Sequence, residues 1–166
     1  LDSPLYRLEK LTVLGQKLSQ ATVSLSSAGE FMLKFSSTLT GNQASDPAPL
    51  LALSLAETTQ AYEILSQVSA DLSSDRPNIS NLTWFGICLS YEKLTKEIPK
   101  LAASVSQARS LLTILPDLVG LNNHKKTYLV LLQNNSELRP TGGFIGSFGL
   151  VSFENGRLLD FQVHDV

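Results

Sequence analysis

The spacing of apolar residues changes once along this chain, and that change limits the folds open to it. From about residue 5 to residue 115, apolar residues recur every three or four positions, which places them on one face of an α-helix. After residue 126, short apolar runs alternate with turn residues, a pattern typical of β-strands. The sequence therefore predicts an α+β chain: an antiparallel helical bundle, followed by a β-strand and a β-hairpin that form the first part of an α/β domain.

The first predicted helix runs from about Leu5 to Leu25. Ser3 and Pro4 precede it, the usual order of an N-cap residue and a first-turn proline. Gly29 permits a bend, so residues 30–39 either form another short helix or continue the first. The apolar stripe of this helix consists of Leu11, Leu14, Leu18, Ala21 and Leu25.

Two further helices are predicted, from about Pro49 to Leu72 after a loop at residues 41–49, and from about Leu94 to Leu115. Pro99 requires the third helix either to kink there or to start near Ile98, and Pro116 is expected to end it. A coiled-coil dimer is the alternative to a bundle. The positions that flank the stripes carry mostly Ser, Thr, Gln and Ala, which give little pairing information. The bundle is therefore favoured.

The strand region begins with a continuous apolar run, Thr127–Leu132, which predicts a strand covered on both faces. Asn155–Gly156 then separates two strand-like runs and predicts a type I′ hairpin. The expected register places Phe153 opposite Leu158, Leu150 opposite Phe161, and Phe148 opposite Val163. The face expected to be buried consists of Phe148, Leu150, Leu159, Phe161 and Val163. Glu154 and Arg157 are expected side by side at the turn, and Asp160 and His164 on the opposite, solvated face.

The predicted domains are a helical bundle or stalk at residues 1–118 and, at residues 119–166, the first part of a sheet-containing domain. Three strands alone make a poor sheet, so this domain is expected to continue beyond the chain.

Composition excludes several kinds of partner and site. A net charge of −2 with scattered basic residues gives no reason to expect nucleic acid or an anionic membrane as a partner. Cys88 is the only cysteine, which rules out an internal disulfide, and its apolar neighbours predict a buried side chain. No phosphate-binding loop, dinucleotide fingerprint or Ser/His/Asp order occurs. No cofactor and no metal are predicted.

The segment Gln133–Gly146 is predicted to be a polar, glycine-rich loop after a buried strand, where proteins often place functional residues. Arg139 could hold a phosphate or carboxylate through two hydrogen bonds. Thr141, Gly142 and Gly143 could turn successive N–H groups toward the same anion. The candidate ligand-binding residues are Asn134, Asn135, Glu137, Arg139, Thr141, Gly142 and Gly143.

A purely structural interpretation of these residues is also open. Arg139 could pair with Glu137 or cap loop carbonyls, and the glycines could satisfy unusual backbone angles. The asparagines could hydrogen-bond their own loop. A second group, Asp160, His164 and Asp165, would need a third ligand to hold a metal, and the sequence does not identify one.

Three segments together resemble a bacterial family called domain of unknown function 4012. They are Leu115–Gly120 (LPDLVG), Tyr128–Arg139 (YLVLLQNNSELR) and Thr141–Gly149 (TGGFIGSFG), within a resemblance that covers roughly residues 111–165. It implies an envelope protein with an extracytoplasmic body and a membrane anchor upstream of this chain. A looser likeness, in the order of elements only, connects the chain to the LytR-CpsA-Psr transferases, whose full set of arginines and aspartates is not visible here.

The resemblance leads to a first expectation of a non-catalytic, extracytoplasmic module that binds a cell-wall glycan or another envelope protein, or acts as a scaffold. The alternative is an enzyme, a transferase acting on polyprenyl-pyrophosphate-linked glycans, with Arg139 holding the pyrophosphate. Self-association through the helices, giving a homo-oligomer, is a third alternative.

Overall fold

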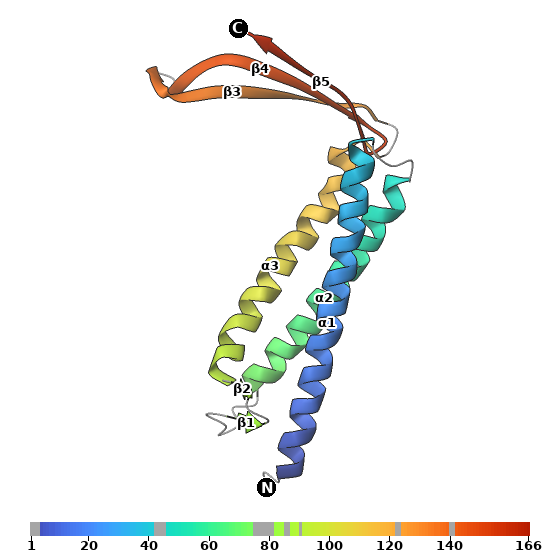
Figure 1. Cartoon of the computed structure of the whole chain (residues 1–166), viewed down its shortest axis with the longest axis vertical. Coiled ribbons are helices and arrows are strands. Elements are labelled where there is room, and N and C mark those ends of the chain that lie inside the picture. The colour runs from blue at the N-terminus through green and yellow to red at the C-terminus, as the bar shows by residue number, and fades with distance from the viewer. Residues whose placement is uncertain are drawn as a thin grey trace. The chain divides into compact units, whose positions relative to one another are not determined.

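The structure, a computed structural model, describes residues 4–41, 46–74, 82–84, 87–89, 91–121, 124–139 and 142–166. Within these ranges, three helices precede a three-stranded antiparallel sheet (Figure 1). The predicted α+β fold, with its helical part followed by a β-hairpin, is confirmed. No helix in these ranges has an apolar stretch long enough to cross a membrane.

The chain packs as two compact units. The first comprises Leu1–Phe31 and Leu53–Leu112, and the second comprises Met32–Ala52 and Thr113–Val166. Most of the helical residues belong to the first unit. The second unit contains the remaining helix ends and the three-stranded sheet. The predicted division after residue 118 stays a prediction.

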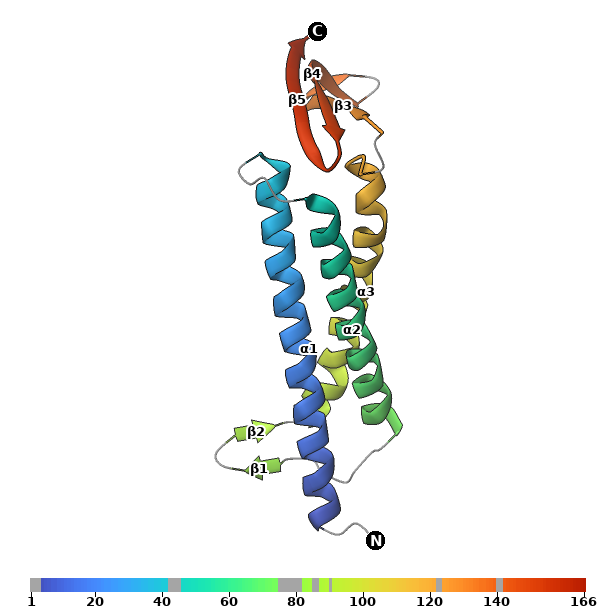
Figure 2. The same ribbon diagram turned by 90° about the vertical axis from the view of Figure 1, so that its right-hand side faces the viewer.

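The helices are α1 (Pro4–Leu39), α2 (Pro47–Ser74) and α3 (Tyr91–Leu118), and they alternate in direction (Figure 2). Their apolar stripes face one another within one chain, as the bundle interpretation predicted. Full burial of a side chain such as Leu65 or Val68 contributes about 1.5–3 kcal/mol. The buried residues of this core are Ala21, Ala61, Leu65, Val68, Leu72, Ile98, Ala102 and Val105.

The structure decides how α1 continues after Gly29 and where α2 begins. α1 continues through Gly29 to Leu39 without interruption. α2 begins at Pro47, two residues earlier than predicted. The Asp46 carboxylate accepts a hydrogen bond of 3.0 Å from the Ala48 N–H, so Asp46 is the N-cap and Pro47 the first helical residue.

The prediction that Pro116 ends the third helix is wrong, because α3 runs through both Pro99 and Pro116 to Leu118. A proline removes one N–H but leaves its own carbonyl free to accept. The Pro116 carbonyl accepts from Leu121 N–H at 3.0 Å, and the Asp117 carbonyl accepts from Gly120 N–H at 3.3 Å. These two bonds form a Schellman motif, which ends the helix.

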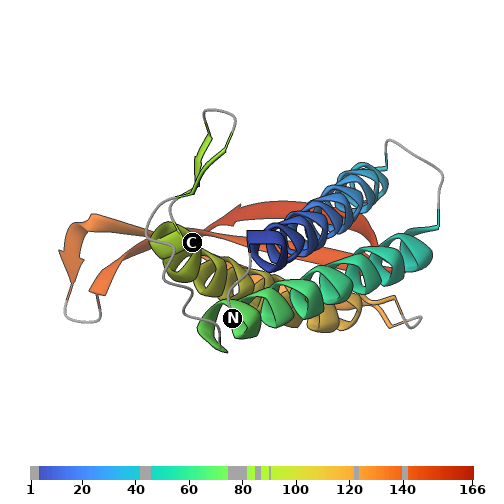
Figure 3. The same ribbon diagram turned by 90° about the horizontal axis from the view of Figure 1, so that it is seen from below.

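A short hairpin connects α2 and α3 and was not predicted. Its strands, β1 (Leu82–Trp84) and β2 (Ile87–Leu89), pair antiparallel and run side by side in Figure 3. The side chain of Cys88 lies outside the described residues, so its predicted burial stays a prediction.

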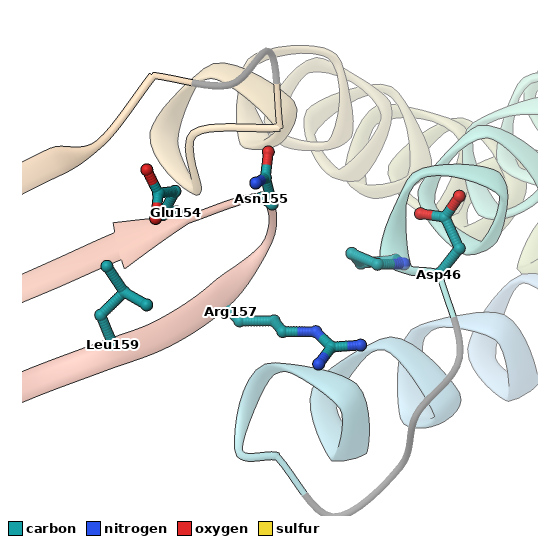
Figure 4. Close-up of a pocket in the computed structure, with 6 residues that line it drawn as sticks. Asp46, Glu154, Asn155, Arg157 and Leu159 are labelled. Atoms are coloured by element: carbon teal, nitrogen blue, oxygen red, sulfur yellow. The ribbon is translucent and has the colours of Figure 1, made fainter.

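The larger sheet has the order β3–β4–β5, from strands β3 (Lys126–Arg139), β4 (Gly142–Glu154) and β5 (Arg157–Asp165). The predicted type I′ hairpin is confirmed: Asn155 and Gly156 have φ angles of +51° and +70°. Glu154 pairs with Arg157 as predicted. Their side chains nevertheless diverge, since Arg157 extends away from Glu154 (Figure 4).

The predicted register holds only next to this turn. Phe153 does pair with Leu158, but Leu150 pairs with Gln162 and Phe148 with His164. A bulge between Ser152 and Phe153 leaves Leu159 without a partner and shifts the rest of the ladder by one residue.

This shift divides the face that was expected to be buried. Phe148 and Leu150 share a face with Asp160 and His164, whereas Phe161 is on the other face with its partner Val151. Asp160 and His164 do share a face, as predicted, but not one opposite Phe148.

The predicted burial of the strands is also wrong. Leu129, Val130, Leu131 and Leu132 each expose between 40% and 60% of their surface, and every residue of β5 is exposed. A continuous apolar run indicates a buried strand only where other layers cover both faces. Within the described residues these side chains are not covered in that way.

The turn between β4 and β5 is bonded to the end of α3. Asn155 N–H donates to the Gly120 carbonyl at 2.9 Å, and Gly156 N–H donates to the Val119 carbonyl at 3.0 Å. The Tyr128 hydroxyl donates to the Leu118 carbonyl at 2.8 Å. Strand β3 and the β4–β5 turn are therefore both bonded to the C-terminal end of α3, at Leu118–Gly120.

Candidate functional site

The segment predicted to be an open loop is largely paired backbone. β3 continues to Arg139 and β4 starts at Gly142, so Gln133–Gly146 forms the outer end of a hairpin. Arg139 pairs with Gly142 and Leu138 with Gly143. The ladder is irregular, with register shifts between Leu132 and Gln133 and between Asn134 and Leu138. These polar residues lack the alternation of apolar side chains that is typical of a strand. They still extend β3, because antiparallel strands pair through backbone N–H and C=O groups.

Asn134 stabilises the irregular part of this hairpin end. Its side-chain oxygen accepts a hydrogen bond of 3.0 Å from the Ser136 N–H. The bond lies at the register shift between Asn134 and Leu138. The structural interpretation of Asn134 is confirmed. Asn135 is exposed beside it.

Gly143 allows the two strands to approach closely, and Gly142 has a backbone angle that favours glycine. A Cβ atom at Gly143 would overlap the backbone carbonyl of Asn134, and one at Gly142 would lie 2.8 Å from Nε2 of Gln133. Gly142 also has a φ of +117°. Both positions therefore have a backbone role. The interpretation that their N–H groups bind an anion stays a prediction.

The charged candidates are described only in part. Glu137 is exposed near the end of β3. Arg139 is the last residue of that strand, and only its backbone is described. Its side chain lies outside the described residues, as does all of Thr141. Whether Arg139 and Glu137 form an ion pair stays a prediction, as does the anion site that would join them to Thr141.

The acidic and histidine residues of β5 are occupied by neighbours in the sheet. The His164 ring stacks on Phe148, with centroids 5.2 Å apart. Asp160 accepts from Gln162 at 2.6 Å, and Asp165 accepts from the Ser147 hydroxyl at 3.1 Å. Across the described part of the chain, no group of three His, Cys, Asp or Glu residues could hold a metal ion.

An open cavity of about 470 Å³ lies beside the β4–β5 turn (Figure 4). Sequence reasoning missed it, although Asp46 before Pro47 signals a helix start and Asn155–Gly156 signals a turn. One guanidinium and two carboxylates border the cavity, and Leu159, the bulged residue, contributes an apolar wall. Its lining residues are Asp46, Pro47, Glu154, Asn155, Arg157 and Leu159.

Comparison with known proteins identifies the sheet region. Residues 123–165 match the family model described as "Protein of unknown function (DUF4012)". We call residues 123–165 the DUF4012 segment, after the family model that they match. No curated protein and no solved structure matches the chain. The family resemblance seen in the sequence is therefore confirmed for this segment.

The DUF4012 segment contains all three strands of the larger sheet and every residue of the candidate site. It also contains the turn that is bonded to the end of α3. The family model thus matches the part of the chain in which the sequence placed the candidate binding residues.

Proposed function

We propose that this chain is a non-catalytic binding module of a membrane-anchored, extracytoplasmic envelope protein. In this proposal the outer end of the β3–β4 hairpin binds a cell-wall glycan, and the helices serve as its support.

One observation carries the proposal. The hairpin end presents a row of exposed polar side chains, Gln133–Glu137. The first two residues of this row pair with β4, and the Asn134 side chain accepts a hydrogen bond from the Ser136 N–H. Amide side chains offer both donors and acceptors, which suits the hydroxyl groups of a sugar. Groups that are already positioned lose less entropy when they bind.

The extracytoplasmic location rests on the family resemblance. A fusion of the full-length protein to a reporter enzyme that is active only outside the cytoplasm tests it. Activity of this reporter in the fusion supports the location, and activity of a cytoplasm-dependent reporter at the same position contradicts it.

Glycan binding is tested by the melting temperature of the chain in the presence of soluble cell-wall fragments. We expect the fragments to raise the melting temperature, and Asn135→Ala with Glu137→Gln to remove that rise. Arg157→Gln is the matched control, because Arg157 is an exposed polar residue at the opposite end of the sheet, and it should leave the rise unchanged. No rise with any fragment would contradict glycan binding and leave a protein partner as the alternative.

The same assay separates binding from transfer chemistry. A rise in melting temperature with short-chain prenyl pyrophosphates, lost in Arg139→Gln, would replace the proposal with the transferase alternative. A response to glycan alone, independent of Arg139, would support the binding module.

A further inference from the structure

Among the described residues, no strand pairs with the outer edge of β5, and the backbone groups along that edge follow a regular pattern. Val166 N–H donates to the Gly146 carbonyl at 3.1 Å, which sets the phase of the β4–β5 ladder. Because ladder bonds alternate along a strand, Gln162 and His164 direct their N–H and C=O groups toward β4. Phe161 and Val163 therefore direct theirs away from the sheet. Within the described residues, β5 lies at the end of the strand order β3–β4–β5 (Figure 1).

This edge is better suited to pairing than the edge formed by β3. β3 contains two register shifts, which interrupt its row of backbone groups. β5 is regular from Asp160 to Asp165 and contains neither proline nor lysine, the residues that usually protect an edge strand. Phe161 and Val163 are 58% and 52% exposed, so apolar surface accompanies the free hydrogen-bonding groups.

The side chains of β5 are self-complementary about Gln162. Phe161 and Val163 are one residue away on either side, and Asp160 and His164 are two residues away. A two-fold axis through Gln162 of an antiparallel pair places each Phe161 opposite a Val163, and each Asp160 opposite a His164. The axis thus generates two aromatic–aliphatic pairs and two acid–base pairs from one strand.

This register also agrees with the backbone. Each Phe161 forms a hydrogen-bonded pair with a Val163 of the other copy. Such a pair needs N–H and C=O groups that point away from β4, and both residues have them. Asp160 and His164 become non-hydrogen-bonded pairs, in which side chains lie closest. A register centred on Phe161 would instead have to pair Arg157 with Asp165 across the bulge at Leu159.

We infer that β5 is the pairing edge for a second copy of this chain, joined antiparallel about Gln162 into a six-stranded sheet. Antiparallel pairing puts the two Asn155–Gly156 turns, and the α3 ends bonded to them, at opposite ends of the paired strands. The inference is independent of the proposed function.

Sedimentation of the chain over a wide concentration range is the first test, with a reversible monomer–dimer equilibrium expected. Val163→Pro should abolish the dimer, because it removes an outward N–H without removing a bond to β4. Amide exchange of Gln162 and His164 must stay slow in this variant, which shows that the β4–β5 ladder is intact. A monomer at every concentration would overturn the inference.

Charge exchange tests the register without relying on proline. Asp160→Lys and His164→Glu should each weaken self-association, since each removes both acid–base pairs. A mixture of the two variants should form a heterodimer, at least about tenfold tighter than either homodimer, because Lys then faces Glu and His faces Asp. Failure of the mixture to associate would contradict this register.

A disulfide at the two-fold axis gives a third readout. In a Cys88→Ser background, Gln162→Cys should cross-link two copies on mild oxidation, because non-hydrogen-bonded pairs have Cα atoms within disulfide reach. Phe161→Cys should cross-link poorly. The reverse result would overturn the register.

Discussion

Asn155 donates its backbone N–H to the carbonyl oxygen of Gly120, across 35 residues of chain and a distance of 2.9 Å. The bond connects a β-turn to a helix C-terminus, two structures that each leave backbone groups without internal partners. The carbonyl at the end of a helix lacks an intrahelical donor, and the turn supplies one. Each element therefore completes the hydrogen bonding of the other.

Gly156→Ala should destabilise this contact. A Cβ atom there would lie 2.6 Å from Pro47 and 2.8 Å from Leu121, at a φ of +70° that alanine disfavours. We expect a loss of about 1–3 kcal/mol in the free energy of unfolding, measured by urea denaturation. Gly15→Ala is the matched control. It has open space around it in a helix and should gain about 0.5–1 kcal/mol. Equal effects of the two changes would contradict the prediction.

Asp46→Ala should weaken the start of α2. The variant removes the acceptor of the Ala48 N–H, which lies 3.0 Å away, and a lost N-cap costs about 1 kcal/mol. Urea denaturation measures the loss. Asp46→Ser keeps an accepting oxygen and should retain most of the stability, so a loss as large as that of alanine would argue against a capping role.

Leu65→Ala should show where the helical core is. Leu65 is 1% exposed at the centre of the buried cluster, and its truncation should cost about 2–5 kcal/mol. Leu33→Ala makes the same chemical change at a residue that is 72% exposed, and it should alter stability by no more than about 0.5 kcal/mol. Thermal or urea unfolding of both variants checks the difference. Similar values would mean that the helices pack differently.

Asn134→Ala should loosen the outer end of the β3–β4 hairpin. The Ser136 N–H loses its acceptor, and a hydrogen bond of this kind contributes about 0.5–1.5 kcal/mol. We expect the Ser136 amide to exchange about threefold to tenfold faster with solvent, as measured by NMR. Asn134→Asp keeps the oxygen and should preserve slow exchange. Unchanged exchange in the alanine variant would show that the bond does not hold the hairpin end.

The helices were predictable because their signal is local and repeated. Residues such as Ala21, Leu65 and Val105 lie in the core where the three–four spacing placed them. The end of α3 was not predictable from Pro116 alone. Proline disfavours a helix because it has no backbone N–H to donate to the preceding turn. Here the helix ends at Leu118 instead, where Gly120 and Leu121 donate the two hydrogen bonds of the Schellman motif.

The sheet was predictable in type but not in register or burial. The Asn155–Gly156 turn identified the hairpin, yet nothing in the local sequence signals the unpaired Leu159. Burial of Leu129–Leu132 depends on what covers the sheet, which is a property of distant residues. Apolar composition alone could not determine it.

The candidate site was predictable in position only. Residues 134–139 and 142–143 do lie together at one end of the sheet, on strands rather than in an open loop. Glycine pairs at such positions have two explanations, ligand binding and close strand approach. The overlap that a Cβ at Gly143 would make with the Asn134 carbonyl establishes the second and leaves the first to experiment.

The unpaired Leu159 gives the β4–β5 hairpin a tolerance to change. Next to the turn, Phe153 pairs with Leu158. Farther along the ladder, where Phe148 pairs with His164, the register is shifted by one residue of β5. Leu159 absorbs that difference, so its deletion would leave every other cross-strand partner in place. Turn and sheet can therefore diverge independently during evolution, and insertions or deletions among DUF4012 relatives should concentrate at this position.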